Sequence, residues 1–88
     1  MAARGGLTRA ETGAINEPVQ REVLRQLWRG ERTLLTLSKE VDCHKKTVRR
    51  HVKQLQKIEL VAVVFEEKRK QFWGLTNRGE LVVERALR

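Results

Sequence analysis

The spacing of apolar residues changes along this chain, and the change restricts the fold more than any other feature of the sequence. Up to residue 55, apolar side chains recur at the three- to four-residue spacing that keeps them on one face of a helix. From residue 60 to residue 75, β-branched and aromatic residues form two short runs around a charged stretch, which is the pattern of a β-hairpin. Helices followed by a hairpin predict a small α+β domain.

Two helices are predicted in the first half of the chain. Pro18 suits a first helical turn, where its missing amide is not needed, and the apolar period predicts a helix from Pro18 to about Arg29. Thr33 is a suitable N-cap for a short second helix. The apolar positions of that second helix are Leu34, Leu37 and Val41.

The second half is predicted to hold a third helix, the hairpin and a final helix. The third helix runs from about Lys45 to Lys57, and its buried stripe is Val48, Val52 and Leu55. In the hairpin, strands at Leu60–Phe65 and Gln71–Leu75 flank a charged tip at 66–70. Thr76 caps a final helix. The partial apolar face of this final helix is Leu81, Val82 and Leu87.

Length and composition indicate one domain with one core. Residues 1–15 lack an apolar period and contain three glycines, so we expect a disordered N-terminal arm and a folded domain over residues 16–88. The longest apolar run, Leu60–Phe65, is far too short to cross a membrane. With one cysteine and no signal peptide at its start, the chain is expected in a reducing cytoplasm.

Basic residues gather on the predicted third helix. Nineteen Lys and Arg against eleven Asp and Glu give a net charge of +8, which attracts polyanions. Between His44 and Lys57 there are six basic residues and no acidic one, and they lie opposite or beside the buried stripe. A helix with such a face fits the major groove of B-DNA. The alternative is a solvated helix face, but such faces usually mix charges of both signs. The six residues are Lys45, Lys46, Arg49, Arg50, Lys53 and Lys57.

A second basic cluster, Lys68, Arg69 and Lys70, lies at the hairpin tip. Long cationic side chains at a tip can reach a neighbouring groove or phosphate. The alternative is that a turn is charged because it is exposed to water, and the adjacent Glu66 and Glu67 weaken the local field. We expect helix 45–57 in the major groove and tip residues 67–70 on the flanking DNA backbone.

Residues 18–84 resemble the winged helix-turn-helix superfamily, in particular the arsenical-resistance and multiple-antibiotic-resistance regulators. The stretch Thr47–Leu55 is similar to their recognition helix, and Phe72–Gly79 is similar to the end of their wing. The resemblance implies a three-helix core, a C-terminal two-stranded wing and a short final helix. It also implies base-facing positions at Lys46, Thr47, Arg49 and Arg50, and a wing tip at Lys68–Lys70. Where these families often have glycine, this chain has Glu59.

The sequence is interpreted as that of a sequence-specific double-stranded DNA-binding transcriptional regulator and not of an enzyme. Repression is expected, because covering a promoter is the simplest way for a bound protein to regulate transcription. The expected DNA contacts are Lys45, Lys46, Thr47, Arg49, Arg50, Lys53, Lys68, Arg69 and Lys70. Because one short helix reads few base pairs, a homodimer on a two-fold site is expected. The alternatives are a non-specific or architectural DNA binder and a winged-helix protein-interaction module.

Other chemistry finds little support in the sequence. Cys43, His44 and His51 are too few for a soft-metal site, so neither a metal nor a cofactor is expected. No nucleophile stands beside a base, and no glycine-rich phosphate loop is present. The four aromatic residues fall on apolar periods and are expected in the core rather than stacked on single-stranded bases. No small-molecule pocket is expected in a chain with one core.

Overall fold

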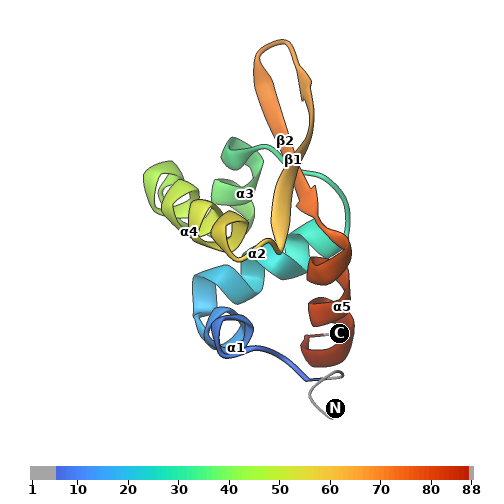
Figure 1. Cartoon of the computed structure of the whole chain (residues 1–88). Coiled ribbons are helices and arrows are strands. Elements are labelled where there is room, and N and C mark those ends of the chain that lie inside the picture. Colours follow the sequence, from blue (N-terminus) through green and yellow to red (C-terminus); the bar gives the residue numbers. More distant parts are fainter. Residues whose placement is uncertain (1–5, 88) are drawn as a thin grey trace.

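A two-stranded hairpin projects from a body of five helices in the computed structural model, which describes residues 6–87 (Figure 1). The described part of the chain measures 45 × 23 × 21 Å, and the hairpin accounts for its elongation. None of the described helices is long and apolar enough to cross a membrane. In chain order the elements are α1 (Arg9–Asn16), α2 (Pro18–Trp28), α3 (Leu34–Glu40), α4 (Lys45–Lys57), β1 (Val61–Glu67), β2 (Lys70–Leu75) and α5 (Asn77–Ala86).

The predicted disordered arm is wrong over residues 9–15, because α1 forms there. The helix begins with a capping box: the Glu11 amide donates to the Thr8 hydroxyl at 3.1 Å, and the Thr8 amide donates to the Glu11 carboxylate at 2.9 Å. The Thr8-x-x-Glu11 spacing signalled this cap in the sequence. A contact with α5 holds the helix in place. Residues 1–5 of the predicted arm lie outside the described residues.

That contact is an ion pair between Glu11 and Arg78, which joins α1 to α5. Arg78 Nε and Nη2 donate to the two carboxylate oxygens at 2.6 and 2.7 Å. The Glu11 side chain is only 6% exposed, so the pair is shielded from water on one side. The Arg78 hydrogen bonds, opposed by burial, lower the pKa of Glu11 to about 2. The two ends of the domain are thus held together across 67 positions of sequence.

The helices from α2 to α4 confirm the sequence prediction closely, and chain reversals fix their ends. After α3, Asp42 adopts φ +56°, and the Cys43 amide donates back to the Ser38 carbonyl at 3.0 Å. After α4, Glu59 adopts φ +64°, and the Leu60 amide donates to the Leu55 carbonyl at 3.1 Å. Both reversals satisfy carbonyls that a helix end leaves unpaired. Glu59 therefore occupies a left-handed position that favours glycine.

One core lies between the helices and the hairpin base, and α1 contributes Ala14 to it. Trp73 from β2 is its largest fully buried side chain. On the final helix, Val82 and Val83 are buried while Leu81 and Leu87 are only half-buried, so the predicted apolar face is shifted. The buried apolar residues are Ala14, Val23, Leu24, Leu27, Leu37, Val48, Val52, Leu55, Leu60, Val61, Trp73, Val82 and Val83.

Two aromatic side chains expected in the core lie on the surface instead. Trp28 is 38% exposed and Phe65 is 46% exposed. The strand register is interrupted between Val63 and Phe65, and the resulting bulge separates Phe65 from the core-facing pair of Val63 and Trp73. Phe65 stacks on Phe72 with 4.5 Å between ring centroids. Cross-strand stacking therefore replaces burial for this ring.

Gly79 is required by a close approach between α5 and the chain that follows α4. A Cβ at this position would collide with the Leu60 backbone carbonyl, which is held by the Thr76 amide at 3.0 Å. We expect Gly79→Ala to lower the free energy of unfolding by about 1–3 kcal/mol, because neither backbone segment can move freely. The control is Gly13→Ala in α1, where a Cβ meets nothing within 4 Å and should add about 0.5–1 kcal/mol. Urea unfolding of both variants measures this, and equal effects would contradict the close approach.

The Glu11–Arg78 pair predicts a loss of stability in acid. Because the pKa of Glu11 is lowered from 4.5 to about 2, its contribution is complete above pH 4.5 and disappears as the pH falls towards 2. We expect Glu11→Gln to remove about 1–2 kcal/mol at pH 7 and to flatten the fall between pH 4.5 and 2. Thermal unfolding across this range measures both, with Glu66→Gln as an exposed control. Parallel profiles for wild type and Glu11→Gln would show that the pair contributes nothing.

Candidate nucleic-acid interface

Helix α4 presents its basic residues on one side, as predicted. Val48, Val52 and Leu55 are 0% exposed and fix the rotation of the helix against the core. All six basic residues of the helix are exposed. A shallow groove along this face is lined by Lys46, Arg49, Arg50, Lys53, Gln54 and Lys57. The face is rigid because it is the reverse side of a fully buried stripe.

The start of α4 is set by the turn that follows α3. His44 is the N-cap, and its Nδ1 accepts from the Lys46 amide at 3.3 Å. The short helix α3 packs directly before it, and Arg32 Nε donates to both Glu40 carboxylate oxygens at 3.0 and 3.1 Å. Residues 34–57 thus form two helices joined by a tight turn, with the cationic helix second.

A polar network between α2 and α4 was not anticipated from the sequence. The Gln20 Nε2 group donates to His51 Nδ1 at 3.0 Å and to Gln54 Oε1 at 2.6 Å. Glu17 Oε1 lies 3.8 Å from the same histidine nitrogen. Gln20 and His51 are buried, so the network ties α4 to α2 beside the cationic face. No local sequence pattern reveals it, because its partners are 31 and 34 residues apart.

The hairpin places the second basic cluster at its far end. Both strands are longer than predicted, because Glu66 and Glu67 of the predicted tip belong to β1 and pair with Gln71 and Lys70. The turn itself is Lys68–Arg69, with φ of +50° and +68°. Positive φ at both central residues is the geometry of a tight hairpin turn, which asparagine and glycine adopt most readily. Lys68 and Arg69 are neither asparagine nor glycine, so their positive φ angles strain the backbone of this turn.

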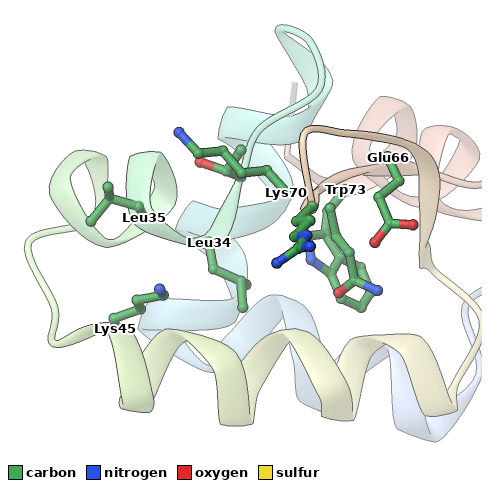
Figure 2. Close-up of a pocket in the computed structure, with 9 residues that line it drawn as sticks. Leu34, Leu35, Lys45, Glu66, Lys70 and Trp73 are labelled. Atoms are coloured by element: carbon green, nitrogen blue, oxygen red, sulfur yellow. The ribbon is translucent and has the colours of Figure 1, made fainter.

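A cleft lies between these two basic regions. It is bounded by α3, the start of α4 and the hairpin, and Lys45, Arg69 and Lys70 are among the residues that line it (Figure 2). Lys53 of α4 approaches the base of the hairpin, with its Nζ 5.7 Å from the centre of the Trp73 ring. The cleft is therefore lined by cationic side chains from both the start of α4 and the hairpin tip, beside the apolar Leu34, Leu35 and Trp73.

The nine predicted contact residues do not all occupy equivalent positions. Lys46, Arg49, Arg50 and Lys53 share the α4 groove, while Lys45 joins the cleft. Lys68 and Lys70 line a hollow on the hairpin with Glu67 and Phe72. Thr47 is half-buried and lines none of these three hollows. Gln54 and Lys57 belong to the groove, although neither was among the predicted contacts.

Cys43, His44 and His51, which were weighed as metal ligands, do not form such a site within residues 6–87. Across this part of the chain, no three His, Cys, Asp or Glu side chains converge as metal ligands would. Cys43 is a half-buried free thiol, and His44 and His51 serve in the cap and the α2–α4 network.

Comparison with known proteins identifies the family. The model of a family described as "Helix-turn-helix domain" matches residues 15–64, from the end of α1 into β1. This match spans more than half of the 88 residues, and the chain belongs to this helix-turn-helix family. No curated protein matches it in sequence.

Solved structures confirm the winged helix-turn-helix fold. HlyU from Vibrio cholerae is similar with a TM-score of 0.76 and 18% identity, over 85% of this chain and 82% of HlyU. The transcriptional repressor BigR from Xylella fastidiosa gives 0.75 and 18%, over 89% and 79% of the two chains. Mb0332 from Mycobacterium bovis, a homodimeric winged helix-turn-helix DNA-binding domain and possible ArsR-family regulator, gives 0.72 and 16%, over 92% and 81%. In this fold, the hairpin is the wing and α4 is the second helix of the motif.

The strained wing turn gives a direct test of its geometry. Replacing Lys68 by Asn and Arg69 by Gly should raise the free energy of unfolding by about 1 kcal/mol, because both residues tolerate positive φ. Chemical denaturation measures this change. The control replaces both residues by alanine, which removes the same charges and keeps the unfavourable φ. A gain of similar size in the control would mean that charge repulsion, rather than backbone conformation, destabilises the turn.

Proposed function

We propose that this protein is a sequence-specific double-stranded DNA-binding transcriptional regulator. The main observation behind this proposal is helix α4. One face of the helix carries six exposed cations, while the apolar stripe on its other side is completely buried. A helix of this width enters the major groove, where Arg and Lys donate to guanine O6 and N7. Arg49 and Arg50, near the start of α4, are the proposed base-reading residues, and Lys57 at its end is a proposed phosphate contact.

The wing supports this proposal with a second set of cations. With α4 in the major groove, residues 67–70 are proposed to lie on the flanking backbone, where Lys68, Arg69 and Lys70 meet phosphates. Such contacts fix the register of a protein on DNA and carry no sequence information themselves. Their loss should weaken binding to every duplex alike.

We infer that the regulator acts as a homodimer and as a repressor. One helix reads only a few base pairs, so two copies on a two-fold site are needed for useful specificity. The similar Mb0332 is described as homodimeric, and BigR is described as a transcriptional repressor. Helices α1 and α5, which lie together at the end opposite the wing (Figure 1), are the proposed dimer surface. The proposed place of action is a reducing prokaryotic or virus-infected cytoplasm.

Salt-dependent binding to a short random DNA duplex tests the central claim. We expect tight binding at low salt and a steep loss of affinity with rising salt, because each phosphate contact releases counterions. On a random duplex, which offers no matching bases, the α4 cations are proposed to meet phosphates. Alanine at Lys46, Arg49 and Arg50 should then flatten the slope of log K against log salt by about 0.9 for each lost phosphate contact. Fluorescence anisotropy measures the DNA affinity of the wild type and of the triple-alanine variant at each salt concentration.

The control replaces Arg25, Arg29 and Lys39, three exposed cations outside α4, the wing and the proposed dimer surface, so that the change in net charge is equal. Equal losses in both triple variants would mean that net charge alone drives binding. Competition between a selected site and random duplex then separates the alternatives: a ratio near one indicates an architectural binder. No binding at low salt would overturn the proposal and favour a protein-interaction module.

A further inference from the structure

We propose that Gln54 of α4 reads the edge of a DNA base, and that Gln20 of α2 turns the Gln54 amide so that it reads only as a hydrogen-bond donor. The inference rests on the proposed function above and deepens it. It adds a specificity residue that the sequence did not reveal, and it names guanine as the base that this residue selects.

Gln54 differs from its neighbours in the α4 groove. It is exposed and lies one helical turn after Arg50, on the same side of α4. Among the described residues that line the groove, Gln54 is the uncharged one, and the other five are Lys or Arg. A neutral amide adds little to the attraction of phosphates, which is a matter of charge. In the major groove, however, an amide distinguishes bases by their donors and acceptors.

A buried side chain of another helix holds Gln54 from behind. Gln20 is 8% exposed, and its backbone amide donates to the Glu17 carboxylate at 2.8 Å in the first turn of α2. The two N–H groups of Gln20 Nε2 are both used: one donates to His51 Nδ1 at 3.0 Å and the other to Gln54 Oε1 at 2.6 Å. The buried histidine therefore fixes which end of the Gln20 amide faces α4.

This hydrogen bond restricts what Gln54 can offer to DNA. An unrestrained glutamine pairs with adenine through both ends of its amide, because the oxygen accepts from N6 and the nitrogen donates to N7. In this chain the Gln54 oxygen is directed at Gln20, so the NH₂ group is left for the DNA. Two N–H donors fit guanine, whose major-groove edge carries the acceptors O6 and N7. The restraint also reduces the side-chain freedom that Gln54 loses on binding.

Competition binding with single-base variants of a selected site tests the base preference. At one position we expect the wild type to prefer guanine over adenine about fivefold or more, and Gln54→Ala to bind both alike. Gln54 is exposed, so this variant should fold. If the wild type prefers adenine at that position, the amide is not held as a donor, and the proposal is wrong. If Gln54→Ala weakens binding to every sequence equally, Gln54 contacts a phosphate, and the proposal is also wrong.

Gln54→Glu reverses the group that faces the DNA. One carboxylate oxygen still accepts from Gln20, and the other faces the DNA as an acceptor. The preference should therefore change from guanine to cytosine, whose N4 amino group donates. The control is Gln56→Glu, which makes the same charge change at an exposed residue of α4 outside the groove. The control should keep the guanine preference, and a guanine preference retained in Gln54→Glu would contradict base reading by this residue.

Gln20→Glu tests the positioning role of the buried residue. A carboxylate only accepts, so the Gln54 amide should turn its nitrogen towards it and its oxygen towards the DNA. The preferred base should then change from guanine to adenine or cytosine, which both carry an amino group in the major groove. A loss of stability alone would weaken binding to every site without changing the preferred base. An unchanged guanine preference in Gln20→Glu would overturn the positioning role.

NMR of the ¹⁵N-labelled chain without DNA tests the same arrangement independently. We expect a nitrogen–nitrogen coupling through the hydrogen bond between Gln20 Nε2 and His51 Nδ1 in the wild type and in Gln54→Ala, and its loss in Gln20→Glu. If the wild type shows no such coupling, Gln20 does not present its nitrogen to His51, and the proposal is wrong. If the chain binds no duplex at all, the proposed function fails, while this coupling still decides whether Gln20 is oriented as proposed.

Discussion

The packing of Trp73 between the wing and the helices is the contact on which the rest of the structure depends. Its ring is fully buried, and its backbone exchanges hydrogen bonds with Arg32 in the loop before α3, at 2.8 and 3.0 Å. Together with Val61 of β1 it gives the hairpin its buried face, and an isolated two-stranded hairpin is marginally stable in water. The buried Trp73 ring and this β-bridge therefore help to fix the position of the wing relative to α4.

The same arrangement separates the rigid and the adjustable parts of the proposed interface. On α4 the cations are fixed by a completely buried stripe and by the Gln20–His51 hydrogen bond to α2. On the wing they stand at the end of a long hairpin, beyond the last core contacts. We infer that α4 determines which DNA bases are recognised, while the wing adjusts to the DNA backbone.

At the other end of the domain a polar contact adds to the apolar packing of Ala14. The Glu11–Arg78 pair brings α1 against α5, and it is held by two short hydrogen bonds to a carboxylate whose pKa is lowered to about 2. A contact of this kind specifies a partner more sharply than apolar burial does, because a one-residue shift leaves a buried charge unpaired. It places the two helices of the proposed dimer surface in one fixed relation.

The sequence by itself determined most of the helices and strands and the basic face of α4. Apolar period, helix caps and charge pattern are local properties, because each depends on a few neighbouring residues. The sequence therefore predicted α2, α3, α4, the hairpin and α5, and the side of α4 on which its cations stand. Only the tertiary structure decided the pairing of α1 with α5, the exposure of Phe65, the Gln20–His51–Gln54 network and the cleft beside Trp73. Apart from the Phe65 bulge, each of these joins residues far apart in the chain, and such pairings are settled by packing and hydrogen-bond geometry rather than by local preference.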